Sequence, residues 1–68
     1  MKAKITETLE QWNVLKGALK EKGYALWQTQ YSTDYPEGYH AWFMKDGNNI
    51  EVVTHSEEVQ EAIVKSGL

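Results

Sequence analysis

One stretch of sequence decides the fold: residues 39–54, YHAWFMKDGNNIEVVT. Asp46 and Gly47 at its centre are typical of a two-residue hairpin turn of the primed type, which needs positive φ at both positions. The aromatic and β-branched residues on either side of the turn favour strands. We therefore expect a tight antiparallel hairpin with one strand over residues 39–45 and the next over Ile50–Thr54.

Alternation along this hairpin divides its side chains between two faces. The more apolar set is expected to face the core, and it contains Tyr39, Ala41, Phe43, Ile50, Val52 and Thr54. The opposite face then holds His40, Trp42, Met44, Glu51, Val53 and His55. Either plausible register across Asp46 and Gly47 places these two sets on the same two faces.

A further strand is expected before the hairpin, over Tyr24–Thr33, where aromatic, β-branched and polar residues alternate. The residues after it, 34–38 (DYPEG), have the chemistry of a turn. Either face of this strand could meet the core. If its odd positions lie away from the helices, Trp27 and Tyr31 join the second face of the hairpin.

The apolar spacing before these strands predicts an amphipathic helix over residues 6–22. Its stripe follows the 3.6-residue period and consists of Ile5, Leu9, Trp12, Leu15 and Leu19. Thr6 and Thr8 are both possible N-caps, and Thr8 stands three residues before Gln11, the spacing of a capping box. Gly23 is expected to end the helix.

A second helix is expected after the hairpin, with Ser56 as its N-cap. Glu57 and Glu58 follow in the first turn, where the helix dipole favours negative charge. The apolar stripe consists of Val59, Ala62 and Ile63. Gly67 and Leu68 then repeat the glycine-plus-apolar ending of the first helix.

The element order is thus α-β-β-β-α, and the sequence predicts a two-layer α+β fold over residues 1–68. We expect a three-stranded antiparallel meander with both helices on one face, because this arrangement buries two amphipathic stripes with short connections. A chain of 68 residues has room for one small domain. Its core is correspondingly limited, since a domain near 60 residues buries only about 60% of its unfolded surface.

Composition excludes several classes of protein. The 68 residues contain no cysteine, so disulfides, thiol nucleophiles and thiolate metal sites are excluded. No apolar run approaches the roughly 20 residues needed to span a bilayer, and no signal-peptide pattern follows Met1. We expect a cytoplasmic protein. The net charge of −3 and the absence of arginine disfavour a general nucleic-acid binder.

Catalysis and metal binding find little support in the sequence, and we expect a protein that is not an enzyme and has no cofactor. His55 and Ser56 are adjacent, but Ser56 is explained by its role as a cap and no third orienting group accompanies them. In one register His40 faces His55 with Glu51 beside them, a set that could hold zinc. No spacing motif accompanies this set.

The second face of the sheet is the candidate functional surface. Helices on one side leave it open, and the aromatic residues and methionine on it are the types enriched in interface cores. The candidate interface residues are Trp42, Met44, Val53, His40, His55, Trp27 and Tyr31. We expect a protein-interaction domain that forms a homodimer or binds another protein. Two alternatives are that the loop carrying Tyr35 covers part of this face, and that a small-molecule pocket lies under Tyr35 and Trp27.

The α-β-β-β-α order, the length and the residues Pro36-Glu37-Gly38-Tyr39-His40 are similar to those of double-stranded-RNA-binding domains. This resemblance implies the same topology and a nucleic-acid partner, with binding through the lysines of the N-terminal third: Lys2, Lys4, Lys16, Lys20 and Lys22. The family's phosphate-binding lysines open its last helix, where this sequence has Glu57, Glu58 and Glu61. Carboxylates there would repel phosphate. Nucleic-acid binding is therefore the second hypothesis.

Overall fold

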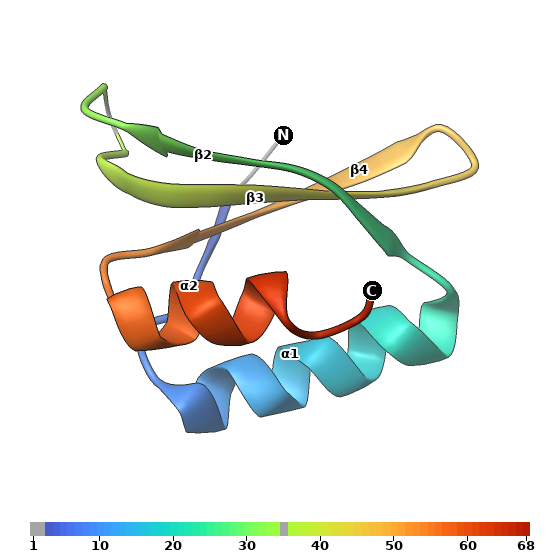
Figure 1. Cartoon of the computed structure of the whole chain (residues 1–68). Coiled ribbons are helices and arrows are strands. Elements are labelled where there is room, and N and C mark those ends of the chain that lie inside the picture. Colours follow the sequence, from blue (N-terminus) through green and yellow to red (C-terminus); the bar gives the residue numbers. More distant parts are fainter. Residues whose placement is uncertain (1–2, 35) are drawn as a thin grey trace.

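The computed structural model describes residues 3–34 and 36–68 and shows one sheet with two helices (Figure 1). The elements are β1 Ala3–Ile5, α1 Leu9–Lys22, β2 Ala25–Ser32, β3 Gly38–Lys45, β4 Asn48–Thr54 and α2 Glu57–Val64. The strand order is β1-β4-β3-β2, with β1 parallel to β4 and the other pairs antiparallel. Both helices lie on the same side of the sheet (Figure 1).

The α+β class and the placement of the helices on one face are confirmed, but the prediction of a three-stranded antiparallel meander is wrong. The sheet has a fourth strand, β1, which makes it mixed: Ile5 lies opposite Val53 in a parallel pair. The amide of Thr6 extends the contact by donating to the carbonyl oxygen of Val53 at 2.9 Å. Three residues are too few to show a strand period, and Ile5 also fitted the apolar stripe of the following helix.

α1 begins at Leu9 because Thr8 caps it, three residues later than the predicted start. The Thr8 hydroxyl accepts from the amide of Gln11 at 3.1 Å, and the Gln11 side chain accepts from the amide of Thr8 in return. The predicted end is confirmed: Gly23 has φ 85°, and the amide of Tyr24 donates to the carbonyl of Leu19 at 3.0 Å. Both ends of the helix are fixed by local hydrogen bonds.

The central hairpin has the predicted turn and the predicted core face. Asp46 and Gly47 both have positive φ, 48° and 83°, as a type I′ turn requires. The register places Ala41 opposite Val52, and both are fully buried against the helices. The turn residues therefore set which side of β3 and β4 is buried.

The core lies between the sheet and the two helices. Trp12 of α1 stacks on Phe43 of β3 with ring centroids 6.0 Å apart. The buried cluster consists of Trp12, Leu19, Ala41, Phe43, Val52, Val59 and Ile63. Each layer thus contributes apolar side chains to a single core.

α2 begins as predicted and ends earlier. The Ser56 hydroxyl accepts from the amide of Val59 at 3.2 Å, which is an N-cap contact. The helix stops at Val64, because Ser66 turns back and its amide and hydroxyl both donate to the carbonyl of Ile63. Gly67, the predicted stop, lies beyond this turn with φ 78°. Leu68 nevertheless packs against the core, as the sequence indicated.

Candidate functional site

The face of the sheet turned away from the helices, called the open face below, carries most of the candidate residues. Its side chains follow from the pairing of β1 with β4 and of β4 and β2 with β3. They include Ile5, Gln28, Gln30, His40, Trp42, Met44, Glu51 and Val53. Figure 1 shows both helices on the far side of the sheet from this face. The predicted membership of His40, Trp42, Met44 and Val53 is confirmed.

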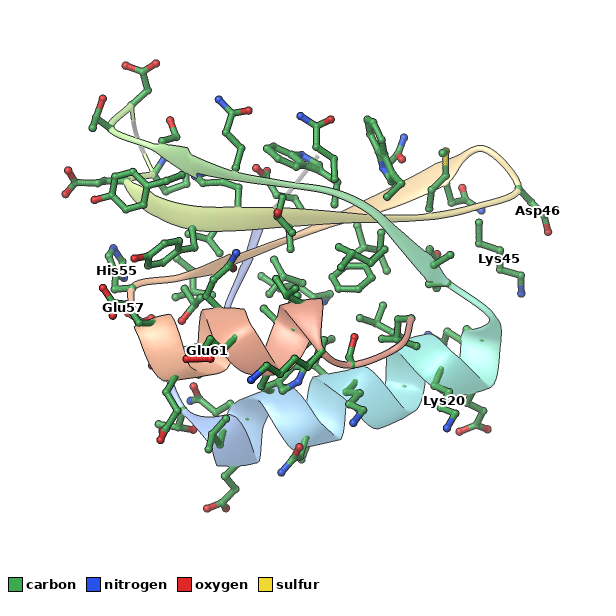
Figure 2. The ribbon with its side chains drawn as sticks, in the orientation of Figure 1. Lys20, Lys45, Asp46, His55, Glu57 and Glu61 are labelled. Atoms are coloured by element: carbon green, nitrogen blue, oxygen red, sulfur yellow. The ribbon has the colours of Figure 1, made fainter. Side chains whose placement is uncertain are left out.

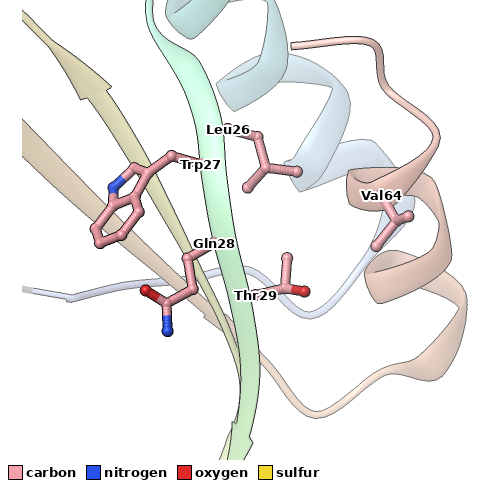
Figure 3. Close-up of a pocket in the computed structure, with 5 residues that line it drawn as sticks. All are labelled: Leu26, Trp27, Gln28, Thr29 and Val64. Carbon is pink, nitrogen blue, oxygen red and sulfur yellow. The ribbon is translucent and has the colours of Figure 1, made fainter.

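A bulge in β2 separates two residues that were expected together. The register shifts between Leu26 and Gln28, so Trp27 and Gln28 both lie on the open side of the strand (Figure 3). Beyond the bulge, Tyr31 lies opposite Tyr39, on the side of the helices. The expectation that Tyr31 accompanies Trp27 is therefore wrong, because an extra residue reverses the side-chain alternation.

Three large apolar side chains of the open face are exposed, and one of them is Ile5 of β1, at 56%. Trp27 is 53% exposed and Met44 is 41% exposed. Trp42 lies between the two edges of the face, half-buried, and stacks on His40 with ring centroids 5.6 Å apart. Aromatic residues and methionine that remain accessible on a flat sheet are typical of contact surfaces.

His40 is buried on the same face and is held from both sides of its ring. Its Nδ1 lies 2.5 Å from Oε2 of Glu51 on β4, and its Nε2 lies 2.6 Å from the carbonyl oxygen of Pro36. Both partners are hydrogen-bond acceptors, and they hold the ring between β4 and the loop before β3. The loop before β3 is thereby attached to the open face, and Val53 beside His40 is fully buried.

The loop thus covers one end of the open face, in line with one alternative from the sequence. The part of that alternative that concerned Tyr35 lies outside the described residues, as does the pocket expected beneath it. The exposed apolar side chains that remain are Trp27 and Met44, with Ile5 at the other edge of the face, whereas Val53 is buried. The candidate site is accordingly smaller than the sequence indicated.

His55 does not belong to this face and pairs with the segment before α1 instead. The Glu7 carboxylate accepts from the backbone amide of His55 at 2.7 Å and from its Nδ1 at 2.6 Å. It also accepts from the Thr54 hydroxyl at 3.2 Å. Figure 2 shows His55 at the end of the domain where α2 begins, near Glu57. Glu7 was not among the candidate residues, because a partner 48 positions away leaves no local signal.

This contact shifts the ionisation of both groups. The hydrogen bond and the charge of Glu7 raise the pKa of His55 above its ordinary 6.5. The hydrogen bonds from the amide and ring of His55 lower the pKa of Glu7 below its ordinary 4.5. The raised pKa of His55 contributes stability below pH 6.5 that is lost as the pH rises through the folded-state pKa. The lowered pKa of Glu7 contributes stability above pH 4.5 that is lost as the pH falls.

Glu7→Gln is therefore expected to lower the urea midpoint of unfolding most between pH 4.5 and 6.5, where both contributions are present. The difference from the parent protein should shrink on both sides of this window. Midpoints measured from pH 3 to pH 9 give the profile. Glu21→Gln, which removes the same charge from the last turn of α1, is the control and should give a flat difference. A flat difference for Glu7→Gln as well would contradict the assignment.

The structure does not bring the candidate residues His40, His55 and Ser56 together as a catalytic or metal site. His40 lies opposite Val53 rather than His55, so the register that would have joined the two imidazoles is not adopted. Within residues 3–34 and 36–68, no three potential metal ligands come together. The hydroxyl of Ser56 is engaged by Val59, as expected for a cap.

The lysines expected for nucleic-acid binding are spread over different elements. Lys4 lies in β1, whereas Lys20 and Lys22 lie in the last turn of α1. Figure 2 shows Lys20 and Lys45 at the end of the domain opposite Glu57 and Glu61. Lys2 lies outside the described residues.

In the part of the chain that the structure describes, neither helix is long and apolar enough to cross a membrane. No protein-family model, curated protein sequence or solved structure gives a significant match to this chain.

Proposed function

We propose that this chain is a non-enzymatic protein-interaction domain that self-associates through the open face of its sheet. The observation that carries the proposal is the exposure of Trp27 and Met44 on a face that neither helix covers. Burying such side chains against a partner removes apolar area from water, the main driving force of association. Trp42, two residues before Met44 on β3, supplies another large side chain.

The charge of the open face favours a second copy as the partner. Its ionisable side chains among the described residues are Glu51 and His40, and these two pair with each other. The surface around them includes glutamine, asparagine, tryptophan, methionine and isoleucine side chains. A twofold contact places the same patch on both subunits, and most of the side chains that would meet are neutral. A cytoplasmic location stays a prediction.

Met44→Lys is expected to weaken self-association by about tenfold, because interface positions of this kind contribute roughly 1–2 kcal/mol. The lysine would place a charge on each subunit at the centre of the contact. Sedimentation equilibrium from micromolar to millimolar concentration measures the dissociation constant. Met44 is partly exposed, so the monomer should unfold within about 0.5 kcal/mol of the parent.

The matched control is Val14→Lys. Val14 is 75% exposed on α1, on the other side of the sheet, and the same charge there should leave association unchanged. A parent protein that sediments as a monomer throughout the concentration range would refute the proposal. Equal effects of Met44→Lys and Val14→Lys would refute the assignment of the surface.

Nucleic-acid binding has less support. α2 opens with Glu57 and Glu58, and the exposed lysines of α1 and β1 lie on different parts of the surface. Nonspecific affinity for duplexes depends on neutralising adjacent phosphates, which requires cations in one patch. The test is a low-salt titration with duplex RNA, and a salt-sensitive complex would favour this hypothesis.

A further inference from the structure

The free edge of β2 is built differently from the other edge of the sheet. β2 is the last strand in the order β1-β4-β3-β2, and no strand flanks it on the outside among the described residues. Natural edge strands are usually protected by charge, proline, short length or a β-bulge. β1, at the other edge, is three residues long and carries Lys4. β2 is eight residues long, ALWQTQYS, and has neither a charged residue nor a proline. Its bulge lies near its start, between Leu26 and Gln28, so residues 28–32 carry none of these protections.

A groove of about 230 Å³ lies against this edge. Its lining residues are Leu26, Trp27, Gln28, Thr29 and Val64. Figure 3 shows Leu26 and Thr29 on one side of β2, turned toward Val64 of α2. The groove therefore runs between the outermost strand and a helix, a place where a further strand can add to a sheet.

A polar atom without a hydrogen-bond partner lies on α2, one helical turn from the groove. Gln60 stands one helical turn before Val64 and so shares that side of the helix. Its Oε1 is buried and has no hydrogen-bond partner among the described residues. A buried acceptor of this kind is normally satisfied, so a donor at this side of α2 would complete the site.

We propose that β2 pairs antiparallel with β2 of a second copy, extending the sheet across two subunits. The contact uses the edge of the sheet rather than its open face, so it goes beyond the self-association proposed above and stands independently of it. The occupant is a second copy because β2 is uncharged along its whole length and therefore meets an identical strand without like-charge pairs.

The regular part of β2 after the bulge, residues 28–32, selects one register, because it pairs along its whole length with a second copy only when the pairing is centred on Gln30. Thr29 and Tyr31 lie on the helix side, and Gln30 between them lies on the open side. Pairing centred on Gln30 sets Thr29 opposite Tyr31 of the partner subunit and keeps every side chain on its own face. Gln28 then lies opposite Ser32 of the partner subunit. This ladder begins after the bulge, in the regular part of the strand.

In this register Tyr31 of the partner subunit enters the groove. Tyr31 is 52% exposed in the single chain, where one edge of its ring contacts Tyr39 with centroids 5.0 Å apart. Opposite Thr29 it would lie beside Val64, and its hydroxyl is a donor on the side of α2 that carries Gln60. Tyrosine combines an apolar ring with a polar tip, which suits this partly polar groove.

A single introduced thiol tests the register, because the chain contains no cysteine. Residues opposite each other in an antiparallel pair have Cα atoms about 4.5–5.5 Å apart, within the range that a disulfide can bridge. Gln30→Cys should therefore form a covalent dimer on mild oxidation. The variant also carries Met44→Lys, which weakens the open-face contact. Cross-linking then reports on the β2 contact alone, so the failure of one proposal can be distinguished from the failure of the other.

The control is Val14→Cys in the same Met44→Lys background, with an equally accessible thiol on α1. Pairing raises the local thiol concentration toward millimolar, so at about 10 μM protein Gln30→Cys should cross-link about a hundredfold faster than the control. Cross-linking of Gln30→Cys should slow toward the control rate when Tyr31→Ala is added to the variant. An excess of a synthetic peptide with the sequence of residues 25–32 should slow it in the same way. Equal rates for Gln30→Cys and Val14→Cys would overturn the proposal, and so would a rate that neither Tyr31→Ala nor the peptide lowers.

Discussion

Trp12→Ala is expected to leave the domain largely unfolded at 25 °C. Trp12 is 1% exposed and stacks on Phe43, so its removal opens a cavity between α1 and the sheet. Truncating a buried tryptophan costs about 3–5 kcal/mol. A 68-residue domain has a total stability of roughly 3–10 kcal/mol at the usual value per residue. Loss of the near-ultraviolet circular dichroism signal at 25 °C would report the unfolding.

Trp27→Ala provides the matched control, since the same substitution is made on the open face where the indole is half-exposed. It should change the free energy of unfolding by no more than about 1 kcal/mol. Both measurements belong at the lowest workable concentration, because association stabilises the folded state. A Trp12→Ala protein as stable as Trp27→Ala would show that the core is not organised around Trp12.

Gly38→Ala is expected to produce the second large effect. Gly38 begins β3 with φ 140°, and a Cβ placed there would lie 2.8 Å from the carbonyl oxygen of Thr54. The neighbouring atom belongs to the backbone, so β3 and β4 would have to separate at this end. Backbone strain alone costs about 1–3 kcal/mol. We expect the urea midpoint of Gly38→Ala to fall below that of the parent protein. The contact of His40 with the loop before β3 should weaken as well, because Gly38 lies between that loop and His40.

Gly17→Ala separates this effect from the general cost of replacing glycine. Gly17 lies inside α1, and a Cβ there meets nothing within 4 Å. Alanine should stabilise the helix by up to about 1 kcal/mol. The two substitutions are chemically identical and are expected to have opposite signs. If Gly38→Ala also stabilised the protein, the close approach of β3 to β4 would not exist in solution.

The elements that could be predicted from the sequence are those fixed by neighbouring residues. Asp46 and Gly47 determine the hairpin because both must adopt positive φ, and the observed angles agree. The contact between Thr8 and Gln11 joins residues three positions apart. The two helices, the central hairpin and its buried face could be predicted from such local signals.

The parts that could not be predicted depend on distant partners or on an irregularity. The bulge between Leu26 and Gln28 separates Trp27 from Tyr31, and the alternation of side chains does not reveal it. Glu7 and His55 lie 48 positions apart. The candidate surface was therefore predicted in outline, whereas its boundary, including the burial of His40 and Val53, needed the three-dimensional structure.

The parallel strand β1 has a consequence for the order in which the chain folds. Ala3 pairs with Glu51, so β1 and β4 close a far longer loop than the hairpin of β3 and β4 does. Closing so long a loop is entropically costly, and contacts of this kind form late. The hairpin of β3 and β4, closed by two residues, can form early. During synthesis on the ribosome, the first strand of the chain would therefore be the last to join the sheet.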